Sequence, residues 1–156
     1  MKTVFKKVLG VTLLEVLLVL VIASLVLVMS IRYYQNATNS AKANSAFDLV
    51  GSVISAADSY INAGNAASTI TSATVLAGYF SGGTVPTSPF GANQAITITG
   101  ASNGSYTIGI PEVTAGACGP LVTNSKANTR ITSTTPTNAG QCTSTGTVSI
   151  VVSPSA

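Results

Sequence analysis

The sequence predicts an α+β protein in which one long N-terminal helix packs on a small antiparallel sheet. Three observations lead to this prediction. Residues 11–31 form an uninterrupted apolar stretch, an apolar stripe with helical spacing continues to residue 61, and short segments that alternate apolar and polar residues follow. The chain therefore divides into a basic leader (1–10), an apolar half of the helix (11–31), an amphipathic half (32–63) and a globular α+β domain (64–156).

The composition excludes several classes of function. Charged residues make up only 7% of the 156 residues and hydrophobic residues 46%, whereas a soluble domain carries about 25% charged residues. His, the commonest general base and metal ligand, is absent. Beyond residue 10, four basic residues balance four acidic ones, and they form no basic stripe of the kind that binds nucleic acids. We expect no enzymatic activity, no cofactor and no metal.

The apolar stretch 11–31 has the length of a membrane span. As a helix that rises ~1.5 Å per residue, it would cover roughly 30 Å, the thickness of a bilayer's hydrocarbon core. Lys2, Lys6 and Lys7 precede it, which places the N-terminus in the cytoplasm and the rest of the chain outside. A secretory signal peptide and an uncleaved anchor remain alternatives, although the stretch is longer than a usual signal-peptide core.

Glu15 is the one charge within this stretch. A lone carboxylate in a membrane segment is costly, so it usually has a functional partner. Cleavage after Gly10 would free an α-amine on Val11, and that amine of one subunit could neutralise Glu15 of a neighbouring subunit. Such a pair would be desolvated, so losing one partner would cost far more than losing a surface ion pair. The alternative is that Glu15 merely extends to the lipid headgroups.

The run KKVLGVTLLE at residues 6–15 resembles the class III signal of type IV prepilins and pseudopilins. The resemblance implies that a membrane prepilin peptidase cuts after Gly10 and methylates the amine of Val11. It assigns Glu15, with Thr12 beside it, to subunit registration during assembly. Val at the first mature position, and the residues 33–37 beyond the apolar stretch, are similar to the type IVb branch of these pilins.

The resemblance also implies a function and a set of partners. The chain would wait in the inner membrane with its C-terminal domain in the periplasm, and then join other copies of itself in an extracellular pilus. Such filaments serve adhesion, aggregation, motility, DNA uptake or conjugation, and inner-membrane machinery assembles them. Two other functions are a pseudopilin of a type II secretion system and a membrane-anchored exported binding protein that never polymerises. Glu15 argues against the anchored protein, and the scarcity of carboxylates argues against the pseudopilin.

The helix is expected to continue to Asn62, because no Pro interrupts the sequence from Val11 to that point. Gly64, with Asn62 and Asn65 around it, is a stop signal. An apolar stripe with alternating steps of three and four residues marks the face of this second half that packs on the globular domain. It consists of Phe47, Val50, Ile54, Ala57 and Ile61.

The globular domain is predicted to contain three strands and a short helix. Residues 95–99 and 106–110 alternate apolar and polar positions, and the glycine-bounded loop 100–104 between them suits a hairpin. Residues 147–152 form the third strand candidate, residues 68–80 a short helix, and Pro86, Pro89 and Gly91 mark a loop. Few large apolar residues are available for a core, so burial between subunits is expected to supplement it.

Cys118 and Cys142 are the only cysteines. In an extracytoplasmic domain we expect them to form a disulfide, and closing a loop of ~25 residues contributes roughly 3 kcal/mol. A metal site would need more ligands than these. The resemblance implies that Cys118 opens a disulfide-bounded segment that helps to form the exposed surface and the subunit contacts. The two basic residues of the globular domain, Lys126 and Arg130, are expected to be solvated, with contact to DNA or to an acidic neighbour as the alternatives.

Overall fold

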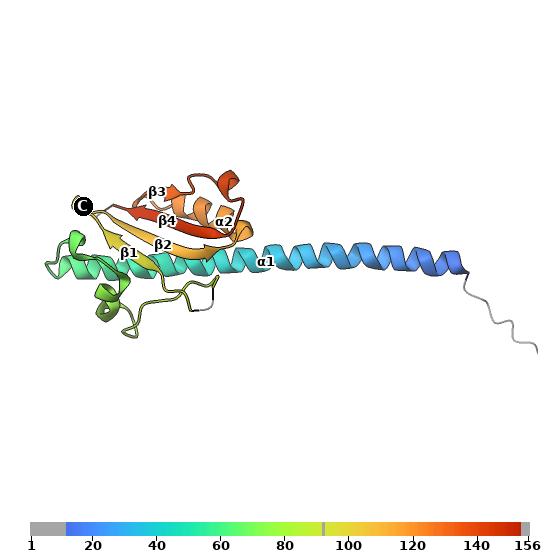
Figure 1. The fold of residues 1–156 in the computed structure, drawn as a ribbon, viewed down its shortest axis with the longest axis horizontal. Coiled ribbons are helices and arrows are strands. Elements are labelled where there is room, and N and C mark those ends of the chain that lie inside the picture. Colours follow the sequence, from blue (N-terminus) through green and yellow to red (C-terminus); the bar gives the residue numbers. More distant parts are fainter. Residues whose placement is uncertain (1–11, 92, 154–156) are drawn as a thin grey trace, which may run out of the picture. The chain divides into compact units, whose positions relative to one another are not determined.

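The computed structural model of the chain describes residues 12–91 and 93–153. They belong to two compact units that divide between Asn36 and Ala37. The long helix α1 (Leu13–Asn62) contributes to both units (Figure 1). It forms because its 50 residues contain no Pro and a single Gly, Gly51, whose position is exposed. The prediction of one long N-terminal helix is therefore confirmed.

Helix α1 ends where the sequence predicts a stop. Gly64 adopts a φ of +93°, a left-handed conformation that costs glycine nothing, and its N–H donates to the carbonyl of Ile61 at 2.9 Å. The side chain of Asn65 donates to the carbonyl of Tyr60 at 3.0 Å. These bonds satisfy carbonyl groups that the last turn of a helix would otherwise leave without partners.

The second unit contains a four-stranded antiparallel sheet, which confirms the predicted α+β class. Its strands are β1 (Thr97–Gly100), β2 (Tyr106–Val113), β3 (Ile131–Thr135) and β4 (Gly146–Val152), in the spatial order β1-β2-β4-β3. In register, Ile98 pairs with Ile108, and Ile108 with Ile150. The apolar residues therefore share one face of the sheet, while the alternate positions of β1 and β4 carry Thr, Ser or Val.

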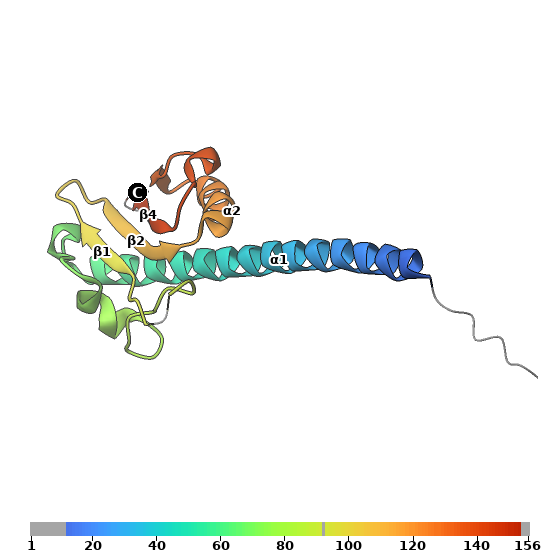
Figure 2. The same ribbon diagram turned by 45° about the vertical axis from the view of Figure 1, so that its right-hand side comes forward.

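The C-terminal part of α1 lies between the sheet and the segment that leads to β1 (Figure 2). That segment holds two short 3-10 helices, η1 (Ala67–Thr69) and η2 (Ala73–Tyr79), and fully buries Ile70 and Leu76. Val50, Ile54 and Ala57 of the predicted stripe are buried, and Phe47 and Ile61 pack partly buried against the same core. Because α1 is covered from two sides, Ala43, Ala46, Val53 and Ala56 are buried as well.

Several local predictions need correction. The segment 68–80 is not one helix but the two 3-10 helices η1 and η2. The first strand begins at Thr97, because Ala95 makes only an isolated bridge to Thr87, and Gly100 belongs to the strand and not to the hairpin loop. The second strand continues past Pro111 to Val113 through a β-bulge.

Helix α2 (Ala115–Lys126) and strand β3 were not predicted at all. Helix α2 contains Pro120, which normally disfavours a helix interior. It packs on the core through Leu121 and Val122, both buried. A Cβ on Gly116 would lie 2.3 Å from the amide nitrogen of the Asn39 side chain, so α2 lies close to α1 there and a larger residue would require the Asn39 side chain to move. Tertiary packing thus overrides the weak local preference of this segment.

Two buried hydroxyls lie in this added layer. The hydroxyl oxygens of Ser125 in α2 and Thr134 in β3 have no hydrogen-bond partner among the described residues. Thr134 faces the core, where its strand neighbour Ile150 is fully buried. A buried hydroxyl without a partner has lost its bonds to water and gained nothing in return.

We expect Thr134→Val to stabilise the second unit by about 1 kcal/mol, because a methyl group replaces a desolvated hydroxyl of similar size. Thermal unfolding of the full chain in detergent micelles, followed by near-UV circular dichroism, measures the change. Thr135→Val is the matched control, since that side chain is exposed in the same strand. A loss of stability in Thr134→Val that exceeds the loss in the control would contradict the prediction.

Candidate functional site

Residues 13–31 of α1 present apolar side chains in every direction. Within this part of the first unit, the exposed fraction of the large apolar residues ranges from 46% at Val16 to 79% at Leu13. A helix that is apolar all round is stable only where other apolar groups surround it, in a bilayer or among other helices. Among the described residues, α1 is the helix long and apolar enough to cross a membrane, as a membrane anchor or a signal segment requires.

The hydroxyl groups within this segment need no outside partner. Ser24 donates to the carbonyl of Val21 at 2.7 Å, and Ser30 donates to the carbonyl of Val26 at 2.8 Å. Both bonds stay within the helix, which is how Ser is accommodated in an apolar environment.

Glu15 differs from these hydroxyls. Its side chain is exposed in the first turn of α1, and its carboxylate has no hydrogen bond or ion pair among the described residues. The positive end of the helix dipole favours a negative charge at this position, but by only about 0.3–1 kcal/mol. That amount does not offset the cost of placing a carboxylate in an apolar environment. Glu15 is therefore the one side chain between residues 13 and 31 that calls for a partner of opposite charge.

Thr12 has a structural role that the sequence reasoning missed. Its hydroxyl accepts a hydrogen bond from the backbone N–H of Glu15 at 3.3 Å, and its carbonyl accepts from the same N–H at 2.9 Å. Thr12 thus satisfies a backbone donor at the start of α1, as an N-cap residue does. The spacing Thr-x-x-Glu is that of a capping box and could have revealed this role. Gly10 and Val11, the predicted processing residues, lie outside the described residues.

The second unit contains the expected disulfide. Cys118 in α2 is bonded to Cys142, which directly follows the short 3-10 helix η3 (Ala139–Gln141). The Cα atoms are 5.7 Å apart, within the normal range for a disulfide. The bond closes a segment of the chain that includes β3, an edge strand of the sheet, and joins it to the buried side of α2.

Arg130 is not the freely solvated charge that the sequence suggested. Its guanidinium forms a bidentate ion pair with Asp58 of α1, in which Nη2 donates to Oδ1 at 2.8 Å and Nη1 donates to Oδ2. Nη2 also donates to the carbonyl of Ser153 at 3.3 Å. Because only 27% and 23% of the two side chains are exposed, the pair is partly desolvated and links α1, the start of β3 and the end of β4.

Lys126, the other basic residue of this unit, has a weaker contact. Its ammonium group donates to the amide oxygen of Asn138 at 3.3 Å, and the side chain is otherwise exposed to solvent.

Tyr106 lies beside this ion pair and is fully buried. Burial, reinforced by the negative charge of Asp58, raises the pKa of the Tyr106 hydroxyl to about 12. The hydrogen bonds to Asp58 raise the pKa of Arg130 above its ordinary value, so the guanidinium stays charged. This cluster is a structural link between α1 and the two ends of the strands β3 and β4.

The described residues contain no group of three or more His, Cys, Asp and Glu that could hold a metal ion. Glu112, the carboxylate that follows Asp58 in the sequence, instead accepts a hydrogen bond from Gln94 at 3.0 Å.

No protein-family model matches this chain, and no curated protein or solved structure matches it either.

We expect Arg130→Met to destabilise the second unit by about 1–2 kcal/mol, between the values for exposed and buried ion pairs, because it leaves Asp58 partly desolvated without its partner. Lys126→Met removes the same charge from an exposed position and should change the free energy of unfolding by less than about 0.5 kcal/mol. Thermal unfolding of the full chain in micelles compares the two variants. Equal effects would show that the Asp58–Arg130 pair contributes nothing.

The pKa of Tyr106 predicts a loss of stability at alkaline pH. In the unfolded chain the hydroxyl ionises near pH 10, whereas in the folded chain it ionises only near pH 12. Its contribution is therefore complete below pH 10 and is lost as the pH rises to 12, by about 2–3 kcal/mol in total. Tyr106→Phe should flatten this part of the pH profile of unfolding, and Tyr79→Phe, at an exposed position, should not. An unchanged slope in Tyr106→Phe would contradict the assignment.

Proposed function

We propose that this chain is a prepilin-like subunit that is cut after Gly10, anchored in the inner membrane and polymerised into an extracellular filament. The observation that carries the proposal is Glu15, a carboxylate without a partner among the described residues, in the first turn of an exposed and wholly apolar helix segment. The resemblance of residues 6–15 to the class III prepilin signal supplies the missing partner. It is the α-amine that cleavage would create on Val11 of a neighbouring subunit.

The pairing of amine and carboxylate explains why a costly charge belongs in this segment. Before assembly, Glu15 lies close to the membrane surface, where lipid headgroups and water solvate it in part. In a bundle of apolar helices, packing alone fixes the sliding position of one helix on another only weakly. A desolvated charge that must meet a positive partner selects one register, because every other register leaves it unpaired.

Burial of the exposed apolar segment supplies favourable free energy both for anchoring in a membrane and for packing between subunits. The large side chains of this segment are exposed, so the same surface suits a bilayer first and the helices of other subunits afterwards. The second unit would then form the outer layer of the filament. Its disulfide and its Asp58–Arg130 pair hold that layer together outside the cell, where a reducing environment is absent.

Processing is the first prediction of this proposal. Gly10→Val should block cleavage, because a branched side chain replaces the smallest residue at the cut, whereas Lys2→Gln should leave cleavage intact. The intact mass and N-terminal sequence of protein from its own cells measure both. The unsubstituted chain should begin at Val11 with one added methyl group. A start at Met1 would indicate an uncleaved anchor, a start beyond Ser24 a conventional signal peptide, and either result would refute the proposal.

Assembly is the second prediction. Glu15→Ala should leave cleavage and membrane insertion intact but abolish filaments or reduce them at least tenfold, since the α-amine of each neighbour loses its partner. Ser24→Ala is the matched control, because Ser24 is satisfied within its own helix. Electron microscopy of the cell surface counts the filaments. Normal filaments in Glu15→Ala would rule out the proposed pair, and a processed chain that stays in the periplasm would indicate the secretion pseudopilin instead.

A further inference from the structure

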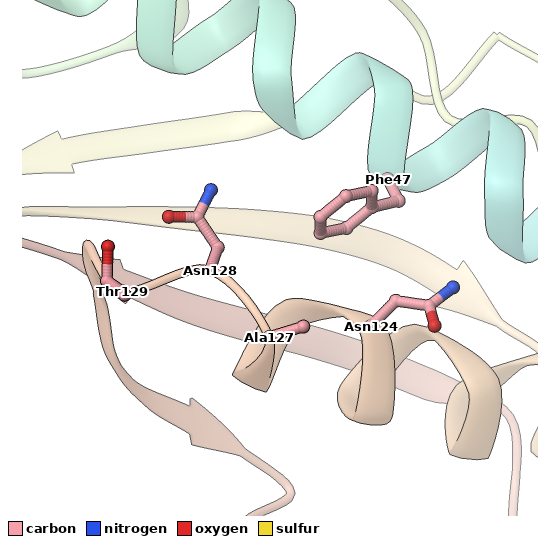
Figure 3. A pocket seen from close by; sticks show the side chains of 5 residues that line it. All are labelled: Phe47, Asn124, Ala127, Asn128 and Thr129. Carbon is pink, nitrogen blue, oxygen red and sulfur yellow. The ribbon is translucent and has the colours of Figure 1, made fainter.

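An open hollow in the second unit lies between α1 and the end of α2. Its volume is about 570 Å³, and its lining is formed by Phe47 of α1 together with Asn124, Ala127, Asn128 and Thr129. Figure 3 shows the ring of Phe47 reaching from α1 toward the end of α2, with Asn128 and Asn124 on different sides of it. Phe47 is only partly buried, so an aromatic surface is open to the hollow.

The polar side chains around this ring retain hydrogen-bonding atoms without partners among the described residues. The Oδ1 atom of Asn128 accepts from the backbone N–H of Arg130 at 3.0 Å, which leaves its Nδ2 donor without a hydrogen bond among the described residues. The Nδ2 atom of Asn124 donates to Asn44 at 3.4 Å, and its Oδ1 acceptor makes no bond within the same part of the chain. The Thr129 hydroxyl is exposed beside them. The hollow therefore offers at least one donor, one acceptor and one group that is both.

No side chain that lines the hollow carries a charge. A phosphate, carboxylate or sialylated ligand would be expected to meet Arg or Lys through charge-assisted hydrogen bonds. The guanidinium of Arg130, the nearest basic group in the sequence, is already bound to Asp58. The chemistry of the hollow thus suits an uncharged ligand.

A neutral sugar combines the features that this lining would recognise. One face of a pyranose ring exposes C–H groups, which are apolar and slightly positive and pack against the negative face of an aromatic ring. Its hydroxyl groups each donate and accept, which matches the free acceptor of Asn124 and the free donor of Asn128. An apolar surface with a few fixed polar groups around it is the usual composition of a small-molecule site.

We propose that this hollow binds a neutral sugar residue, with Phe47 under the ring and Asn124 and Asn128 bound to its hydroxyl groups. The site belongs wholly to the second unit. It does not depend on cleavage at Gly10 or on filament assembly, so its failure and the failure of the proposed function are distinguishable.

The test uses the full chain in micelles of a zwitterionic detergent, because detergents with sugar headgroups would compete. The probes are glucose, galactose, mannose and their N-acetylated amino-sugar analogues. Saturation-transfer NMR reports which sugar protons approach the protein, and labelled Phe rings report whether Phe47 is contacted. We expect saturable binding of at least one sugar in the millimolar range, with the strongest transfer to the protons of one ring face.

Three variants assign the site. Phe47→Leu keeps the apolar packing but removes the aromatic face, and Asn128→Asp keeps the acceptor for the Arg130 N–H but removes the Nδ2 donor. Each should weaken binding at least tenfold. Tyr79→Leu, which removes an exposed aromatic ring outside the hollow, should leave binding unchanged.

Three results would overturn the proposal. One is the absence of saturable binding for every sugar in the panel, and another is binding that is equally strong in Phe47→Leu. The third is a change in the Phe47 signals that depends on protein concentration and not on sugar, since it would show that a second copy of the chain covers the hollow.

Discussion

The second unit depends on the burial of α1 from two sides. Its buried residues are mostly small, with Ala43, Ala46 and Ala57 fully shielded from solvent. Small side chains let the sheet and the segment around η1 and η2 approach the helix closely, but each of them contributes little apolar area. The largest fully buried side chains include Tyr106, Ile108 and Ile150 of the sheet. Larger side chains of the rest of the unit therefore pack closely against the small buried residues of α1.

Because the buried side chains of α1 are small, contacts other than hydrophobic burial also contribute to the stability of the second unit. The disulfide between Cys118 and Cys142 and the ion pair between Asp58 and Arg130 both act on the segment that contains α2 and β3. Two buried hydroxyls of this segment, on Ser125 and Thr134, lack partners among the described residues. Covalent and charged contacts thus supplement hydrophobic packing in this segment.

The sequence was most informative where its pattern is long and regular. The apolar stretch, the stripe through Val50 and Ile54 and the stop at Gly64 gave helix α1 and its buried face, and alternation gave most of β2 and β4. Helix α2 escaped prediction because Gly116, Gly119 and Pro120 are local signals against a helix, and packing on α1 outweighs them. Strand β3 escaped because its sequence, ITSTT, lacks an apolar alternation: as an edge strand it buries only Thr134.

Prediction of the candidate site was uneven for a similar reason. The sequence alone shows that Glu15 is the one charged residue in the apolar stretch. In the structure its carboxylate has no partner among the described residues. The partners of Arg130 come from Asp58 and Ser153, which are distant in the sequence, so no local pattern reveals them. The hollow at Phe47 is likewise lined by residues of α1 and of the end of α2, which are distant in the sequence. No local pattern in the sequence could therefore have predicted it.

The strand order has a consequence for the timing of folding. Strand β4 is the last of the described strands in the sequence, yet it lies between β2 and β3 and pairs with both. During synthesis from the N-terminus, β3 emerges with no neighbour to pair with, and the sheet cannot be completed until residues 146–152 have been added. Contacts between such distant segments form slowly. The sheet would therefore remain incomplete until these residues have been added, and a chain broken off before them would lack one of the two inner strands of its sheet.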